Sequence, residues 1–427
     1  MASRTQNEWV IIGAGAAGLM AARALARGGK SVTLLEARDR WGGRIETLPA
    51  AEWGYAAEAG PEFVHGAASH TRSLMREAGL SLTPSRGTAW YAEDGVLSID
   101  DRSTPYADEF RRELKALTDD LPVAEFLARQ FGDARYAELR RSITRMVEGY
   151  DAADPARAST FALREEWLGR GIAQQGRIAE GYGALMDFLL AECRRQNVAV
   201  HLGAAVTAIA AEVQKVTVRC RDGRAFAADG AILTVPLPLL RRIALPEEAS
   251  AIAAAASADI GFGNVVKILL RFSRQWWAAH GGQDLGDMSF LFSRAAVPTW
   301  WTQHPKAHPV LTGWLAGPRA AAVAALSSDD IVARGLGSLA QNFAVSEDWL
   351  KGMLVAARAI DWGADPFALG AYSYATPNTR QLLARLDRTD ARILFSGEAF
   401  YAGPEMGTVE AAFASGWQAA QKILQHA

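Results

Sequence analysis

The sequence predicts a mixed α/β protein with more than one domain, and three observations support this fold class. The chain has 427 residues, well above the roughly 150 residues of a typical single domain. Half of the residues are hydrophobic and 22% are charged, an ordinary balance for a globular protein. The N-terminal part runs through an apolar strand, a glycine-rich turn, an alanine-rich helix and a second apolar strand. This is the order of a β-α-β unit.

The first motif is a nucleotide-binding pattern, "WVIIGAGAAGLMAARALARGGKSVTLLE", from Trp9 to Glu36. Gly13, Gly15 and Gly18 occupy the turn between the first strand and the helix. Glycines allow the backbone to approach a pyrophosphate, and the helix N-terminus offers free N–H groups. Glu36 ends the second strand, where an acidic residue accepts hydrogen bonds from ribose hydroxyls. We predict a dinucleotide site here, with both NAD and FAD open at this point.

A second glycine turn follows at once in the segment from Arg40 to Arg44, "RWGGR". Arginines on such a turn suit an extended cofactor whose two phosphates need positive charge from a second side. A basic turn that faces solvent is the alternative interpretation.

From this point the sequence resembles the flavin-containing amine oxidase family, which includes monoamine oxidases, polyamine oxidases and histone-lysine demethylases. Its motifs appear in family order along most of the chain: "LLEARDRWGGR" (34–44), "AGPEFVHG" (59–66), "GYGALMDFLLAE" (181–192), "HLGAAVTAI" (201–209), "AILTVPLPLL" (231–240), "DWGADPFALGAYSYATPN" (361–378) and "ILFSGEAFYAGPEMGTVEAAFASGWQAA" (393–420). The segments 81–173 and 278–357 resemble the family least, and we expect substrate choice to be determined there.

The resemblance implies an FAD-binding Rossmann-like (GR2-type) domain interleaved with an α+β substrate-binding domain. The FAD-binding domain would comprise residues 1–78, 178–243 and 366–427, and the substrate-binding domain residues 79–177 and 244–365. Two alanine-rich runs, Ala249 to Ala258 and Ala320 to Leu326, are predicted helices.

The resemblance also implies which residues contact FAD. Glu36 would bind the ribose, Arg44 the pyrophosphate, the main chain near Val206 the adenine, and Glu398 the ribityl chain. The full set of predicted cofactor residues is Gly13, Gly15, Gly18, Glu36, Arg38, Gly43, Arg44, Val206, Glu398 and Val409. Ala371 stands where monoamine oxidases carry a cysteine bonded to the flavin. We therefore expect FAD to be held non-covalently.

One strand carries an unusual lysine: "GFGNVVKILLRF", from Gly261 to Phe272, places Lys267 between Val266 and Ile268. Taken alone, the pattern suggests a lysine on the exposed face of a strand. By resemblance, Lys267 matches the family lysine that contacts flavin N5 through one water. We therefore predict a catalytic role for Lys267, in which it tunes the flavin and supports its reaction with dioxygen.

Several residues are predicted to surround the substrate. By resemblance, Tyr372 and Thr408 match the two positions of an aromatic slot in front of the flavin, although only Tyr372 is aromatic. Glu62 and His65 would serve a charged substrate, with Glu62 receiving the far ammonium of a diamine or polyamine and His65 adjusting the charge near neutral pH. The alternative is that Glu62 and His65 are surface loop residues without such a role. The tryptophans considered as cavity walls are Trp167, Trp300, Trp301 and Trp314.

Composition argues against several classes of function. A net charge of −2 and a pI of about 6.4 provide no basic surface for nucleic acid. The two cysteines and seven histidines show no metal-binding spacing, so we predict no metal, and two core thiols favour a reducing compartment. The polar start from Met1 to Trp9 lacks a signal-peptide pattern. The apolar run from Val10 to Ala26 contains three glycines and Arg23. We expect no membrane span and a cytoplasmic location.

The predicted activity is FAD-dependent oxidation of a primary or secondary amine, or of a polyamine. An apolar cavity would favour the neutral amine, hydride would pass to the flavin, and dioxygen would take up the electrons as hydrogen peroxide. Two redox alternatives stay open: an L-amino-acid oxidase, which needs an arginine for the substrate carboxylate, and a desaturase or dehydrogenase that does not use dioxygen. A chromatin or scaffold protein is a further alternative, but the chain lacks the long helical insertion of such demethylases. The sequence predicts no oligomeric state.

Overall fold

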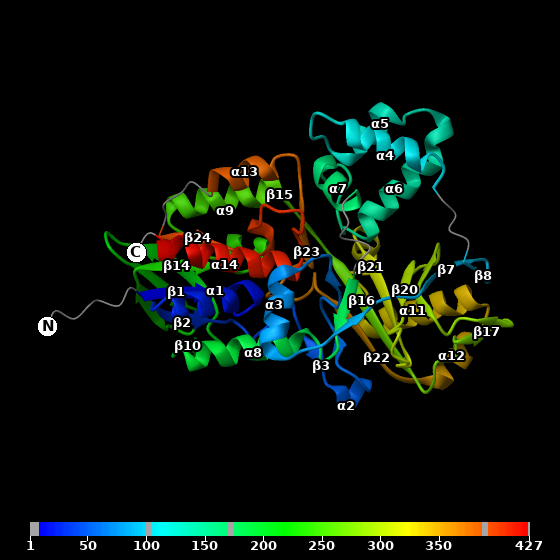
Figure 1. The fold of residues 1–427 in the computed structure, drawn as a ribbon, viewed down its shortest axis with the longest axis horizontal. Coiled ribbons are helices and arrows are strands. Elements are labelled where there is room, and N and C mark those ends of the chain that lie inside the picture. The colour runs from blue at the N-terminus through cyan, green and yellow to red at the C-terminus, as the bar shows by residue number, and fades with distance from the viewer. Residues whose placement is uncertain (1–7, 100–103, 169–174, 387–391, 426–427) are drawn as a thin grey trace.

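The computed structural model describes residues 8–99, 104–168, 175–386 and 392–425. The first residues of the polar N-terminal stretch, 1–7, lie outside this described part. Figure 1 shows two sheet-containing regions side by side, with a separate group of helices next to the second one.

The first sheet has five parallel strands. Their order is β10 (Ala199–His201), β2 (Ser31–Leu35), β1 (Glu8–Ile12), β14 (Gly230–Leu233) and β24 (Ile393–Phe395). Alternate residues of β1 enter two different cores: Ile11 packs with one helical layer, and Val10 and Ile12 pack on the opposite face. A parallel sheet covered on both faces needs such continuously apolar strands.

Four helices cover one face of this sheet: α1 (Ala16–Arg27), α3 (Ser69–Ala78), α8 (Tyr182–Arg195) and α14 (Val409–Gln425). The last helix packs very closely on the first. A Cβ added to Gly416 would lie 2.2 Å from the Ala17 carbonyl oxygen, so only glycine permits this approach. The C-terminal helix thereby fixes α1, whose N-terminus follows the glycine turn.

The opposite face of the first sheet is covered by a small antiparallel sheet and two helices. These elements are β11 (Val206–Ala211), β12 (Val216–Cys220), β13 (Ala225–Ala228), α9 (Glu247–Asp259) and α13 (Thr379–Leu386). All five strands of the first sheet fall within the segments predicted to bind FAD.

The second sheet has seven strands and mixed topology. Their order is β22 (Leu354–Asp361), β16 (Val265–Phe272), β21 (Val310–Ala316), β20 (Thr299–Trp301), β19 (Met288–Ser293), β7 (Thr88–Glu93) and β8 (Val96–Ser98). Val266, Ile268 and Leu270 of β16 pack into the core that includes α11 (Ser328–Phe343) and α12 (Glu347–Met353). Because side chains alternate along a strand, Lys267 points to the opposite face.

A group of helices follows β8 and stands apart from both sheets in Figure 1, above β21. It contains α4 (Ala107–Ala116), α5 (Val123–Gln130), α6 (Ala137–Gly149) and α7 (Thr160–Trp167). Phe110, Phe126 and Phe131 form its aromatic core.

Short elements join these parts. They are β3 (Thr47–Leu48), α2 (Ala50–Trp53), β4 (Ala57–Glu58), β5 (Val64–His65), β6 (Leu82–Pro84), β9 (Gln175–Ile178), β15 (Ile260–Gly263), β17 (Ala279–His280), β18 (Gln283–Asp284), α10 (Pro318–Ala321), β23 (Tyr372–Ala375) and the 3₁₀ helices Ala134–Tyr136, Leu237–Arg242 and Glu398–Phe400.

Candidate active site

One large cavity, of about 1870 Å³, is lined by residues of both sheets and of the helical group. Pockets for small ligands usually measure about 300–1,000 Å³, so this one has room for a large cofactor together with a substrate.

The two glycine turns lie against each other at one end of this cavity. Gly42 N donates a hydrogen bond to Ala14 O at 2.8 Å, and Gly15 and Gly42 form a bridge. Gly13 adopts φ +109°, which disfavours any side chain. The two motifs adjacent in sequence therefore form one backbone cradle, as a pyrophosphate requires.

Gly18 plays a different part from the one predicted. It is not among the described residues that line the cavity, because it is buried beneath the turn: a Cβ there would lie 1.9 Å from Gly13 O. Gly18 thus lets the helix pack under the cradle. The remaining predicted cofactor residues do line the cavity: Gly13, Gly15, Glu36, Arg38, Gly43, Arg44, Val206, Glu398 and Val409.

Glu36 is buried at the end of β2 and holds the cradle from one side. Its carboxylate accepts hydrogen bonds from Ala14 N at 2.8 Å and from Arg38 N at 2.9 Å. Burial raises the pKa of Glu36, and these two backbone donors oppose the shift. The Arg38 guanidinium makes two hydrogen bonds with Asp365, at 3.0 and 2.6 Å.

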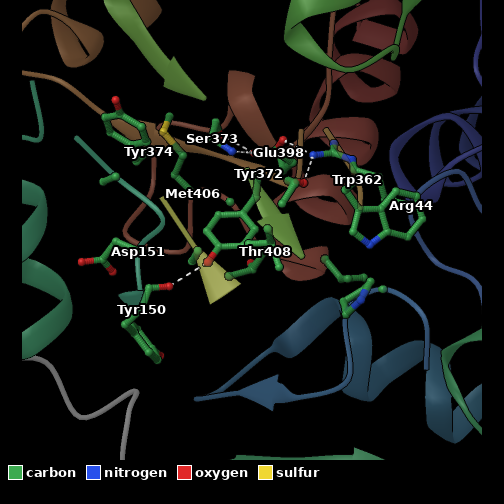
Figure 2. Close-up of a pocket in the computed structure, with 18 of the residues that line it drawn as sticks. Arg44, Tyr150, Asp151, Trp362, Tyr372, Ser373, Tyr374, Glu398, Met406 and Thr408 are labelled. Carbon is green, nitrogen blue, oxygen red and sulfur yellow. Dashed lines mark hydrogen bonds and ion pairs between the residues drawn. The ribbon is translucent and has the colours of Figure 1, made fainter. Parts of the chain in front are cut away.

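Figure 2 shows the opposite end of the cradle, where Arg44 and Glu398 meet. Arg44 donates to Glu398 Oε1 at 2.9 Å and to the Ala371 carbonyl oxygen at 2.5 Å. The other Glu398 oxygen accepts a hydrogen bond from the Ser373 hydroxyl. Ala371 presents no thiol that could bond to a cofactor. These contacts fit a large cofactor held by polar groups alone.

Lys267 is buried, with 1% of its surface exposed, so the alternative of an exposed strand lysine is wrong. Its Nζ donates to Glu62 Oε2 at 2.9 Å and to Gly60 O at 3.2 Å, and it lies 5.4 Å from the centre of the Trp301 ring. Lys267, Glu62 and Trp301 all line the cavity. The strand lysine therefore forms part of the cavity wall.

Glu62 is saturated by donors from the protein. Besides Lys267, it accepts Arg177 Nε at 2.7 Å, Trp301 Nε1 at 3.0 Å and Gln303 Nε2 at 2.9 Å. Burial alone would raise the pKa of Glu62, but Lys267 and Arg177 together lower it to about 2. Glu62 is thus engaged within the protein, which argues against the predicted role of receiving a substrate ammonium directly.

His65 does not fit its predicted role as a group that titrates near neutral pH. Its Nδ1 is buried and has no hydrogen-bond partner among the described residues. Burial lowers the pKa of His65 to about 4. The imidazole therefore stays neutral across the neutral range, although it does line the cavity.

Tyr372 and Thr408 both line the cavity, but their hydroxyls are already engaged. Tyr372 Oη donates to Tyr150 O at 2.7 Å, as the dashed line in Figure 2 shows. Thr408 Oγ1 accepts from Ala411 N at 3.1 Å and donates to Glu405 O at 2.7 Å. Thr408 thereby caps the N-terminus of α14.

The four tryptophans lie in three different environments. Trp301 and Trp314 line the cavity with ring centres 5.7 Å apart. Trp300 is fully buried in the core of the second sheet. Trp167 packs on Phe110 in the helical group and is not among the described cavity-lining residues. This packing gives no support to the predicted substrate contact of Trp167, which stays a prediction.

Sequence reasoning missed a pair of carboxyl groups in the cavity wall, Asp151 and Glu166. The two carboxyl groups interact electrostatically, and both line the cavity. Burial and the proximity of Glu166 raise the pKa of Asp151 well above its usual value, and burial also raises the pKa of Glu166. Figure 2 places Asp151 beside Tyr150, on the side of Tyr372 away from Arg44. These acids lie in the segment where the sequence resembles known proteins least.

Other possible centres are absent from the described part of the chain. No group of histidine, cysteine and acidic side chains there could hold a metal ion, and both cysteines are free and buried. None of the described helices has the length and apolar character needed to cross a membrane.

Comparison with known proteins places residues 16–424 in the family model for flavin-containing amine oxidoreductases. Polyamine oxidase 5 of rice is 29% identical over 98% of this chain and 87% of its own length. Human lysine-specific histone demethylase 2 is 25% identical, over 97% of this chain and 53% of its own length.

Solved structures show the same fold. A double mutant of a putrescine oxidase, made in a redesign of cofactor binding, superposes with a TM-score of 0.80 at 22% identity, covering 98% of this chain and 99% of that chain. Cyclohexylamine oxidase from Brevibacterium oxydans gives a TM-score of 0.78 at 21% identity, with 99% of both chains covered.

Proposed function

The chain belongs to the flavin-containing amine oxidoreductase family, and from this premise we propose that it oxidises a diamine or polyamine and passes the electrons to dioxygen, releasing hydrogen peroxide. As an FAD-dependent amine oxidase it takes hydride from the carbon next to nitrogen, and the flavin supplies this chemistry. The protein's part is to bind, orient and desolvate the amine and to hold the cofactor.

The cofactor would be held by the described cradle. Its residues are the glycine turns around Gly13 and Gly42, Glu36 on one side, and Arg44 with Glu398 on the other. No protein thiol lies at Ala371, so binding is non-covalent.

The observation that carries the choice of substrate is the Asp151–Glu166 pair. Two carboxyl groups that interact this way share a proton, because two adjacent carboxylates repel each other. An ammonium group that enters between them would displace this proton and place its positive charge between the two carboxylates. A monoamine has no second ammonium group to offer. The polyamine oxidase relatives and the putrescine oxidase structure agree with this preference.

Tyr372 connects this acidic pair to the rest of the cavity. Its hydroxyl donates to the carbonyl of Tyr150, the neighbour of Asp151, and its ring packs so close to Gly407 that a Cβ added there would lie 3.5 Å from it. The ring is thereby fixed between the acidic end and the cradle end, where it would align the chain of a long amine.

The test measures peroxide release and oxygen uptake by the FAD-loaded protein on monoamines, diamines, polyamines and L-amino acids. We expect activity on amines with two or more nitrogens. Glu166→Gln should raise KM for a diamine by about tenfold or more, as expected for the loss of one charged contact worth over 1.4 kcal/mol, and should leave KM for a monoamine unchanged.

A matched control is available in the same helical group. Glu125 on α5 pairs with Arg129 and is not among the described residues that line the cavity, so Glu125→Gln should leave the KM for the diamine unchanged. A higher activity on monoamines than on diamines would overturn the proposed substrate class. Activity on L-amino acids alone would favour the amino-acid oxidase, and reduction by amine without reoxidation in air would favour a dehydrogenase.

A further inference from the structure

Glu62 lies at the centre of a buried cluster of three charged side chains. Arg177 and Lys267 approach opposite oxygens of this carboxylate: Arg177 Nε contacts Oε1 at 2.7 Å, and Lys267 Nζ contacts Oε2 at 2.9 Å. Their side chains are at most 11% exposed. Two cations and one carboxylate leave the cluster with a formal charge of +1.

Arg177 lies behind Glu62 as seen from the cavity. Glu62 and Lys267 line the cavity, whereas Arg177 is not among the described lining residues. Arg177 is on β9, which pairs with β5, the strand that begins two residues after Glu62. Its polar link to the reaction space therefore runs through Glu62.

The guanidinium group of Arg177 is rigidly held. Its terminal nitrogens donate to Thr302 O at 2.9 Å and His304 O at 3.2 Å, and it lies 4.5 Å from the centre of the Phe63 ring. A fixed, planar donor confines the carboxylate that it binds. Gln303 and Trp301 supply the other two donors to Glu62, so the carboxylate has no freedom to turn.

This arrangement leaves one donor of Lys267 unused. An ammonium group has three N–H donors, and two of them bind Glu62 and Gly60 O. The third has no acceptor among the described residues. A buried N–H of this kind at a cavity wall needs a partner from outside the protein.

We propose that Arg177 is a positioning residue for the oxidation: it anchors the Glu62 carboxylate, which in turn holds the Lys267 ammonium in place with one N–H directed to the cavity. This inference rests on the proposed participation of Lys267 in the flavin reaction. It adds a residue that neither touches the cavity nor was visible in the sequence pattern.

Two further titratable groups belong to the surroundings of Lys267. Glu58 interacts with Lys267 electrostatically, and burial raises its pKa to about 7. Burial and the charge of Glu62 raise the pKa of Tyr55 well above its usual value. Of the two carboxyl groups near Lys267, Glu62 is the one that hydrogen-bonds to it. The pKa of Glu62 is about 2, so this carboxylate stays ionised around neutral pH.

The experiment is a double-mutant cycle on the FAD-loaded protein, with the reductive and oxidative half-reactions followed separately. Lys267→Met should slow at least one half-reaction by more than about tenfold. Arg177→Gln should slow the same half-reaction by about tenfold in the wild-type background and by less than about twofold in the Lys267→Met background. Such non-additivity is expected of groups that act through one another.

Two readouts separate positioning from general destabilisation. Arg177→Gln removes a buried positive charge and should lower the midpoint potential of the bound flavin. Glu62→Gln, which keeps the side-chain shape, should make the Lys267-dependent half-reaction fall with rising pH above neutrality, because the ammonium loses its carboxylate partner. This second variant also serves if Arg177→Gln does not fold.

The matched control is Arg23, an equally buried arginine that pairs with Glu77 and Glu192 away from the cavity. Arg23→Gln should lower thermal stability but leave both half-reactions and the midpoint potential unchanged. Equal, additive effects of Arg177→Gln in both backgrounds would overturn the role of Arg177 while leaving Lys267 intact. Wild-type rates in both half-reactions of Lys267→Met would overturn the roles of both residues.

Discussion

At the scale of single residues, Glu58 is a buried carboxyl group with an incomplete set of partners. One oxygen accepts hydrogen bonds from Thr47 Oγ1 and Tyr182 N, and the other has no partner among the described residues. Burial raises the pKa of Glu58 from 4.5 to about 7, with the hydrogen bonds opposing the shift. The folded protein therefore binds a proton at Glu58 more tightly than the unfolded chain does.

This raised pKa predicts a pH dependence of stability. Between about pH 4.5 and pH 7 the folded state holds more protons at Glu58 than the unfolded state. The free energy of unfolding contributed by this group therefore falls as pH rises through that window, by up to about 3 kcal/mol. Glu58→Gln should abolish this loss. Relative to the wild type, its free energy of unfolding should therefore be higher at pH 8 than at pH 5.

Denaturant unfolding of the FAD-loaded protein at the two pH values measures the effect. Glu248→Gln, at an exposed position on α9, is the control for removing a carboxyl group and should show no such difference. An identical pH dependence for Glu58→Gln and wild type would contradict the prediction.

The charged cluster shows what sequence patterns reveal about single residues. Lys267 was predicted because a lysine inside an apolar strand is anomalous and because its segment resembles a known family. Arg177 and Gln303 were missed, since their contacts with Glu62 span 115 and 241 positions. Neither residue breaks a local pattern, and only the folded chain brings them together.

At the scale of elements, the residue that precedes α14, Thr408, is one that the family resemblance assigned to the substrate slot. Thr408 caps this helix by accepting a hydrogen bond from Ala411 N. Loss of an N-cap hydroxyl costs about 1 kcal/mol. Thr408→Ala should therefore lower the unfolding free energy by about that amount, whereas Thr408→Ser should retain it.

Chemical denaturation and steady-state kinetics of both variants decide between a cap and a catalytic group. If Thr408 acts only as a cap, kcat of the Ala variant stays within about twofold of wild type under conditions where the protein is folded. A large loss of kcat in Thr408→Ala with unchanged stability would restore the catalytic interpretation.

The two alanine-rich runs show where element prediction succeeds and fails. The run from Ala249 to Ala258 is confirmed as a helix by α9, Glu247–Asp259. The run from Ala320 to Leu326 forms only the short helix Pro318–Ala321, and most of its residues are exposed. Propensity alone does not sustain a helix that has little surface to bury.

At the scale of the whole molecule, the first sheet and its helices depend on the C-terminal segment. β24 pairs with β14, and Phe413 and Ile423 of α14 are buried in the core that contains α1. Burial of each large apolar side chain contributes about 1.5–3 kcal/mol. Summed over Ile393, Phe413 and Ile423, this stabilisation is comparable to the free energy of unfolding of a whole domain, which is roughly 5–15 kcal/mol.

A chain that ends at Leu386 should therefore yield no soluble, FAD-bound protein, even though it retains both glycine turns. Absorbance of the purified protein at the flavin band and its elution volume measure the outcome. A chain that ends at Gln425, the last residue of α14, is the control and should bind FAD. Retention of FAD by the shorter chain would show that the N-terminal motifs suffice.

The overall arrangement could be predicted from the sequence only through resemblance. The glycine pattern and Glu36 predict a β-α-β unit from local spacing, but nothing local indicates that residues 199–201, 230–233 and 393–395 join the same sheet. The acidic pair Asp151–Glu166 was also out of reach, because its two members lie on separate segments of the least familiar region. Pairing between distant segments is decided by packing, which spacing does not encode.

The two indole rings in the cavity wall give this molecule an optical consequence. Trp301 and Trp314 are neighbours there, with ring centres 5.7 Å apart. A flavin bound in the same cavity should accept the excitation energy of these rings efficiently, since energy transfer is strongest at close range. The fluorescence of these two tryptophans should therefore decrease when the cofactor binds and increase when it dissociates. Their emission would then report how much of the protein carries cofactor.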